Sequence, residues 1–119
     1  MPMSLSPSSV NIWPDRQTVD DAVREWAGRQ VKSRPDIRGI AYFGSYARGN
    51  WGPGSDVDIL VIVAAAGTPF LERPRNWDVS TLPVPADVLV YTEGEWAAMP
   101  ADSRFVQTIT CEAVWVYEL

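Results

Sequence analysis

The chain of 119 residues contains no histidine and a single cysteine. Without histidine, neither Ser-His-Asp nor Cys-His catalysis can operate, and the commonest zinc ligand is missing. One cysteine cannot form a disulfide bond within the chain, which fits a reducing cytoplasm as the expected location. Cys111 is expected to be a small apolar residue of the core.

Positive charge and long apolar segments are also scarce. Lys32 is the only lysine, the arginines are scattered, and the net charge is -5. Nucleic-acid-binding proteins neutralise phosphates with clusters of Lys and Arg, so stable binding to DNA or RNA is not expected. The longest apolar run, from Ile59 to Ala66, is far shorter than the roughly 20 residues that span a bilayer, so no membrane segment is expected.

The length suits one domain. Residues 1–16 are rich in serine and proline and are expected to form a flexible N-terminal leader, followed by one domain over 17–119. Apolar periodicity and capping residues predict helices at 19–34, 45–48, 93–99 and 104–111. Short β-prone runs predict strands at 37–43, 56–63, 86–91 and 113–117. The resulting fold class is α/β (α+β), a mixed sheet of about four strands with helices mainly on one face.

Three local features of these elements are specific enough to test. Thr18 is predicted to be the N-cap of the first helix, and Thr92 is predicted to form a capping box with Glu95. The proline-rich stretch 67–85 predicts only a short helical turn near 70–73. Trp77 lies in that stretch, and its indole is expected either to fill the core or to be exposed at a protein interface.

The informative motif is Gly44-Ser45, followed after ten residues by Asp56-Val57-Asp58. On a strand, Asp56 and Asp58 point to the same face with Cα atoms roughly 6.6 Å apart. Two carboxylates so placed repel each other unless a cation lies between them, and Mg²⁺ prefers such hard oxygen ligands. A glycine at a strand-to-helix turn allows close approach of an anion, and Ser45 adds a hydroxyl donor. Arg48, one turn later, could screen the charge of a phosphate or form a surface ion pair.

Asp87 is the candidate for a third acid. It lies within an otherwise apolar strand, where a buried carboxylate without a partner costs several kcal/mol. A cation or a cationic side chain is therefore expected beside it. If its strand pairs with the strand that carries Asp56 and Asp58, the three carboxylates converge.

These residues resemble the signature of the DNA polymerase β-like nucleotidyltransferase superfamily, specifically its minimal nucleotidyltransferase branch. In that family Gly-Ser and Asp-x-Asp lie at about this spacing, and a third acid lies on a later strand. The resemblance implies two divalent ions, Mg²⁺ or Mn²⁺, held by Asp56 and Asp58, with Asp87 beside the acceptor as ligand and general base. It also implies that the nucleotide contacts Gly44, Ser45, Arg48 and Ser55.

The implied activity is transfer of a nucleoside monophosphate from an NTP, AMP from ATP in the first place, to an acceptor hydroxyl. Stand-alone members of this branch act as antitoxins that attach AMP to a tyrosine of a helical HEPN toxin, which makes such a toxin the expected partner. Two alternatives stay open, a non-catalytic antitoxin or adaptor that acts by direct binding, and a small-molecule nucleotidyltransferase of the aminoglycoside type. Assembly as a homo-oligomer or as a hetero-oligomer is compatible with each of these three functions.

Overall fold

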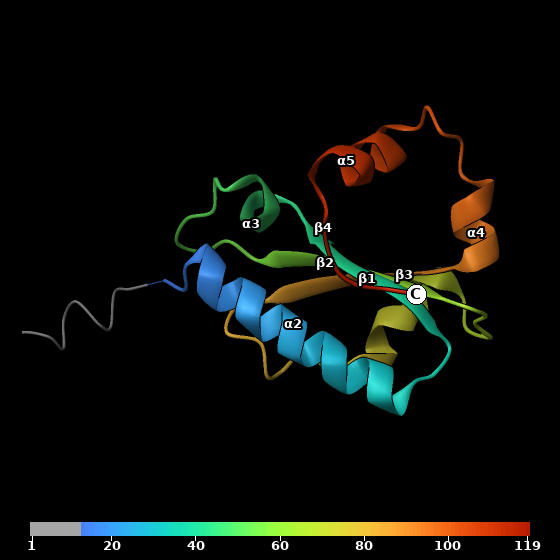
Figure 1. Cartoon of the computed structure of the whole chain (residues 1–119), viewed down its shortest axis with the longest axis horizontal. Helices are drawn as coiled ribbons and strands as arrows, with labels where there is room; N and C mark the ends of the chain where they lie inside the picture. Colours follow the sequence, from blue (N-terminus) through green and yellow to red (C-terminus); the bar gives the residue numbers. More distant parts are fainter. Residues whose placement is uncertain (1–12) are drawn as a thin grey trace, which may run out of the picture.

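The computed structural model of the chain describes residues 13–119 and contains one mixed four-stranded β-sheet (Figure 1). The strands lie in the order β3-β2-β1-β4, with β2 parallel to β3 and the other two pairs antiparallel. Their bounds are β1 (Ile37–Phe43), β2 (Val57–Val63), β3 (Ala86–Thr92) and β4 (Val114–Glu118). The predicted α/β class with a mixed sheet of four strands is confirmed.

One helix precedes the first strand, and further helical segments connect the strands. They are α2 (Arg16–Ser33), α3 (Ser45–Arg48), the 3-10 helix η1 (Phe70–Asn76), α4 (Glu93–Ala98) and α5 (Arg104–Glu112). The capping box at the start of α4 is confirmed, because Thr92 and Glu95 each accept from the other's backbone N–H. Within the described residues, no helix has the length and apolar character needed to cross a membrane.

Helix α2 begins earlier than its sequence indicates. The predicted N-cap Thr18 is wrong, because the Asp15 carboxylate caps the helix and accepts a hydrogen bond from the Thr18 N–H at 2.9 Å. Aspartate and threonine are both good N-caps, so the sequence alone could not separate them. Residues 1–12 of the expected leader lie outside the described part of the chain. Of the remaining leader residues, Trp13 packs against the core.

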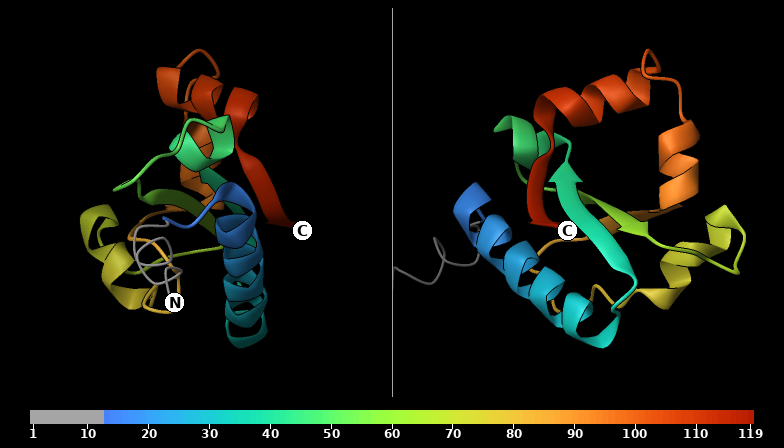
Figure 2. Two further views of the ribbon diagram at one scale, coloured as in Figure 1. Left: turned by 90° about the vertical axis from the view of Figure 1, so that its left-hand side faces the viewer. Right: turned by 45° about the vertical axis from the view of Figure 1, so that its right-hand side comes forward.

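The two faces of β2 pack against different helices, so helices cover both sides of the sheet and not mainly one side as expected. One face of β2 packs against α2. On the opposite face, Leu60 and Ile62 contact Ile109 of α5. Figures 1 and 2 show α2 on one side of the sheet and α4 and α5 on the other. Asp58 belongs to the α5 side, because alternate residues of a strand share a face. The residues that β2 buries on the α2 side are Val57, Ile59, Val61 and Val63.

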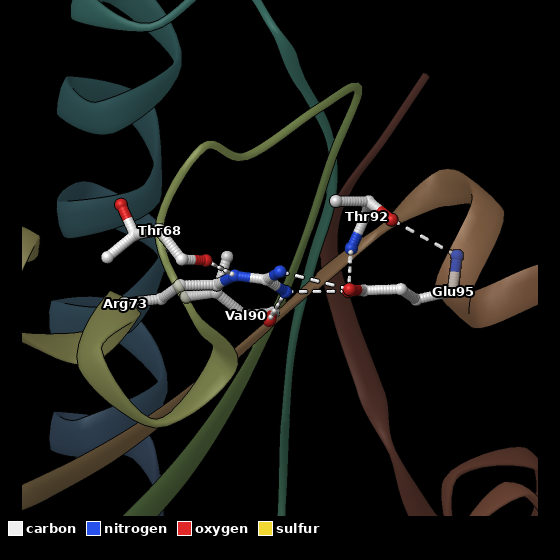
Figure 3. Close-up of polar contacts among 5 residues, drawn as sticks. All are labelled: Thr68, Arg73, Val90, Thr92 and Glu95. Carbon is white, nitrogen blue, oxygen red and sulfur yellow. Dashed lines mark hydrogen bonds and ion pairs between the residues drawn. The ribbon is translucent and has the colours of Figure 1, made fainter.

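The proline-rich segment is held against the sheet by a buried arginine in η1. The Arg73 side chain donates to the carbonyl oxygens of Thr68 and Val90 at 2.8 and 3.0 Å. Its two terminal nitrogens contact the Glu95 carboxylate at 2.6 and 2.9 Å (Figure 3). Only 7% of Arg73 is exposed. These contacts tie η1, β3 and α4 together.

Two side chains show how tertiary packing decides burial. Trp77 is buried, with its ring centroid 6.1 Å from that of Trp26, so core filling is the alternative that holds. Cys111 is exposed on α5, and the prediction that it belongs to the core is wrong. The apolar side of α5 is carried by Ile109 and Phe105 instead.

Candidate functional site

The strand topology brings the end of β1 to the beginnings of β2 and β3. Because β1 and β2 are antiparallel, Phe43 at the end of β1 pairs with Asp58 near the start of β2. Because β2 and β3 are parallel, Asp58 also pairs with Asp87. The Gly44-Ser45 turn follows Phe43 directly. The motifs that are separated in the sequence therefore meet at one end of these three strands.

Three carboxylates converge at this end of the strands. One oxygen from each of Asp56, Asp58 and Asp87 can be chosen so that all three lie within 4.8 Å of one another. The two acid-bearing strands are paired, which is the condition on which this convergence was expected to depend. The expectation that Asp87 is buried is wrong: its side chain is exposed near the start of β3, while Asp56 and Asp58 are half-buried.

The electrostatics of the cluster favour a cation. Burial, followed by the negative charges of Asp56 and Asp87, raises the pKa of Asp58 to about 6. Partial desolvation and the neighbouring Asp56 carboxyl raise the pKa of Asp87 as well. Both shifts show that the cluster resists full ionisation when only protein groups surround it. A hard divalent cation such as Mg²⁺ would relieve this repulsion, and the carboxylate set suits it.

The burial of Asp58 and its repulsion by the other acids predict a pH effect on stability in the absence of divalent cations. Because the pKa of Asp58 is higher in the folded state, the folded state binds more protons between about pH 4 and pH 6. Unfolding free energy should therefore fall as pH rises through that window, by about 1 kcal/mol after allowance for solvent screening. Urea unfolding across this range in EDTA measures it. In Asp58→Asn the fall should be smaller, and an equal fall in both proteins would contradict the assignment.

Gly44 has a conformation and a neighbour that exclude a side chain. Its φ is +85° with ψ at -154°, a region that is essentially restricted to glycine. A Cβ atom added at this position would lie 2.3 Å from Asp58 Oδ2. The turn therefore packs directly against the central acid of the cluster, with Ser45 as the first residue of α3.

Gly44→Ala should destabilise the protein by about 2 kcal/mol or more, because backbone strain adds to the clash with Asp58. Gly49→Ala is the matched control, since Gly49 has the same φ of +85° but open space around its Cα. Chemical denaturation of the two variants provides the measurement. A loss for Gly44→Ala no greater than that for Gly49→Ala would show that the contact with Asp58 is unimportant.

Arg48 points toward a residue that the sequence did not single out. Its guanidinium lies 3.1 Å from Glu112 Oε2, and the same oxygen accepts the Gly44 N–H at 2.8 Å. The surface ion pair considered for Arg48 is therefore present, with Glu112 of α5 as the partner. The helix dipole disfavours an acid at a helix C-terminus, and this mismatch was the available hint that Glu112 has another role.

Ser55 contacts the loop before β2. Its Oγ accepts a hydrogen bond from the Gly52 N–H at 2.9 Å, and its own N–H donates to the Gly52 carbonyl. This pair of bonds closes the turn that leads into Asp56. Ser55 directly precedes Asp56 in the sequence. Its contact with a nucleotide stays a prediction.

A hollow of about 490 Å³ opens beside the acids, a size that suits a small ligand. Asp58 and Asp87 form part of its wall. Its lining also includes Pro74, Trp77 and Val79, from the segment that the sequence left undefined. The buried indole of Trp77 therefore also shapes the space next to the carboxylates.

Solved structures with a similar fold were found by comparison. A structure from Sulfolobus solfataricus assigned to the nucleotidyltransferases shares 20% identity at a TM-score of 0.62, covering 87% of this chain and 83% of the other. A toxin-antitoxin complex with AMP-PNP shares 18% identity at a TM-score of 0.57, covering 81% and 73%. The complex of tri-AMPylated HEPN toxin with MNT antitoxin from Shewanella oneidensis shares 16% identity at a TM-score of 0.52, covering 87% and 73%.

At these identities the likeness establishes a shared fold. Comparison with curated proteins gives no match. A family model described as "Nucleotidyltransferase domain" matches residues 25–115, which include the Gly44-Ser45 turn and all three acids. On that match, the chain belongs to the nucleotidyltransferase domain family.

Proposed function

We propose that the protein is a divalent-metal-dependent nucleotidyltransferase that transfers AMP from ATP to a tyrosine hydroxyl of a HEPN-type toxin, and so acts as an antitoxin. The observation that carries the proposal is that Asp56, Asp58 and Asp87 each place a carboxylate oxygen within 4.8 Å of the other two. Solved structures of the same fold include a tri-AMPylated HEPN toxin with its MNT antitoxin, which supports the choice of acceptor. The AMP-PNP complex supports ATP as the donor.

The donor set fits two Mg²⁺ or Mn²⁺ ions, because carboxylate oxygens are the ligands these cations prefer. Asp56 and Asp58 would hold both ions, and Asp87 would hold the one beside the acceptor. When bound, the ions supply charge stabilisation for the attacking and leaving oxygens at the α-phosphate. Mn²⁺ and Mg²⁺ share this chemistry, so either can serve.

The side chains of this protein would perform the remaining tasks. Gly44, Ser45 and Arg48 would hold the triphosphate, with Ser55 at its flank. Asp87 is exposed at the edge of the cluster, where an acceptor hydroxyl can reach it. Its raised pKa suits a group that accepts the acceptor's proton as the hydroxyl attacks the α-phosphate and pyrophosphate leaves. The hollow of about 490 Å³ provides the space in which donor and acceptor meet.

Transfer of label tests the proposal. The protein is incubated with α-labelled ATP, Mg²⁺ and the protein encoded by the neighbouring reading frame, and the products are separated by gel electrophoresis and mass spectrometry. A mass increase of one AMP unit on a partner tyrosine supports the proposal. Neutralisation of the partner without label, unchanged in Asp56→Ala, would instead favour a non-catalytic antitoxin. Label on an added small aminoglycoside alone would favour the third alternative.

A further inference from the structure

The carboxylate of Glu112 lies on the same groups that the proposed function reserves for the triphosphate. Glu112 is the last residue of α5, far from the turn in sequence. Its Oε2 accepts the Gly44 N–H at 2.8 Å and lies 3.1 Å from the Arg48 guanidinium. Its Oε1 lies 3.5 Å from the same nitrogen of Arg48. One internal carboxylate therefore satisfies a backbone donor and a cationic side chain together.

Local structure alone would not place an acid there. The C-terminus of α5 carries partial negative charge, which repels a carboxylate. The side chain of Glu112 is only 18% exposed, so it also loses part of its hydration. The contacts with Gly44 and Arg48 offset these costs. They are charge-assisted hydrogen bonds, which are stronger than bonds between neutral groups.

Glu112 also belongs to the electrostatic neighbourhood of the acid cluster. Its charge contributes to raising the pKa of Asp58, whereas the charge of Arg48 lowers it. Arg48 contacts the Glu112 carboxylate, and it has a finite number of N–H donors to distribute. A polyphosphate that enters this corner needs the same donors and meets the negative charge of Glu112.

Building on the proposed function, we propose that Glu112 is an internal competitor of the nucleotide triphosphate, which holds Arg48 and the Gly44 N–H until a triphosphate displaces it. Glu112 would then set the affinity for the donor nucleotide without taking part in the chemical step. The opposite role, in which Glu112 orients Arg48 for the triphosphate, would have the opposite effect on affinity. Measuring nucleotide binding therefore separates the two roles.

Glu112→Gln removes the charge and keeps the size of the side chain, and its amide oxygen can still accept the Gly44 N–H. Binding of AMP-PNP with Mg²⁺, measured by isothermal titration calorimetry, should become about threefold to tenfold tighter, from loss of the ion pair and of the repulsion. Glu118→Gln is the matched control, because it removes the same charge from an exposed position at the end of β4. The control should bind as the unaltered protein does.

Glu112→Asp provides a second variant in which the charge remains but the shorter side chain withdraws from Gly44. Its affinity should lie between those of the unaltered protein and Glu112→Gln. Thermal unfolding of each variant confirms that it is folded. In the transfer assay, Glu112→Gln should lower the KM for ATP and leave kcat within about twofold.

Unchanged or weaker AMP-PNP binding by Glu112→Gln, with normal binding by the unaltered protein, would overturn the competitor role and leave the proposed function intact. Tightening by the same factor in Glu118→Gln would also overturn it, since the effect would then be one of net charge. Absence of AMP-PNP binding in all of these proteins would overturn the proposed function together with the role of Glu112.

Discussion

Asp58→Asn is expected to lower nucleotidyl transfer by at least about a thousandfold while making the metal-free protein more stable at neutral pH. The loss follows because Asp58 is the central acid, paired in register with both Phe43 and Asp87. Removing one essential electrostatic group from an active site commonly costs a hundredfold to a thousandfold, and Asp58 would serve both ions. The gain in stability follows because asparagine carries no charge, whereas burial of the Asp58 carboxylate and its repulsion by Asp56 and Asp87 raise the pKa of Asp58 to about 6.

The opposite signs of the two effects make this experiment informative. A variant that merely misfolds would lose activity and stability together. Asp102→Asn is the control, since Asp102 is an exposed acid in the turn before α5 and should keep both properties. Activity is measured as initial rate of AMP transfer, and stability as urea unfolding in EDTA at pH 7.5. Near-normal transfer by Asp58→Asn would show that the cluster is not the catalytic centre.

The largest effect on stability alone is expected for Arg73→Met, about 3 kcal/mol. Methionine approximates the aliphatic part of arginine, but the Glu95 carboxylate and the carbonyls of Thr68 and Val90 all lose a donor. Groups left without partners in this way account for most of the cost, although water can partly solvate Glu95, whose side chain is 43% exposed. Because η1 contacts β3, the loss should also loosen the wall of the hollow that Pro74 contributes.

Arg29→Met is the matched control for this substitution. Arg29 also bridges a carboxylate and another oxygen, those of Glu25 and Thr81, but at an exposed position. Surface pairs of this kind contribute less than about 1 kcal/mol. Chemical denaturation of the two variants gives the comparison, and equal losses would show that burial of Arg73 adds nothing.

The Arg73–Glu95 contact also has a definite pH dependence. The hydrogen bond from Arg73 and the Thr92 backbone N–H lower the pKa of Glu95 to about 2. A carboxyl group with a depressed folded-state pKa stabilises the protein above its unfolded value, and this contribution is lost as pH falls toward the folded value. We expect the loss between about pH 4.5 and pH 2 in the unaltered protein. The same acid titration of Arg73→Met should lack most of it.

The strands and the acid cluster could be predicted from sequence because both depend on local periodicity. The β-prone run 56–63 identified a strand, and alternation along it placed Asp56 and Asp58 on one face. Two acids on a strand and a third on the next strand then need only adjacent pairing to converge, and β2 and β3 are adjacent. The Gly44-Ser45 turn could also be predicted from local sequence, because glycine marks backbone positions that other residues rarely adopt.

Features that depend on distant contacts could not be predicted. Glu112 contacts Gly44 across 68 positions of the chain, and Arg73 meets Glu95 only once η1 has packed beside β3. The exposure of Asp87, next to the buried Val88, depends on which side chains cover the start of β3, and strand propensity does not reveal that. Burial of Trp77 depends on its contact with Trp26 in α2. In each case tertiary packing decides, and a single sequence carries little information about it.

Mn²⁺ replaces Mg²⁺ at oxygen sites, and its free form is quantified by electron paramagnetic resonance, so binding of Mn²⁺ shows whether the three carboxylates hold a metal. We expect that the protein with AMP-PNP at pH 7.5 binds Mn²⁺, that Asp58→Asn weakens this binding at least about tenfold, and that Asp102→Asn does not. Equal Mn²⁺ binding by the unaltered protein and Asp58→Asn would contradict the claim that these carboxylates form a metal-dependent nucleotidyl-transfer centre.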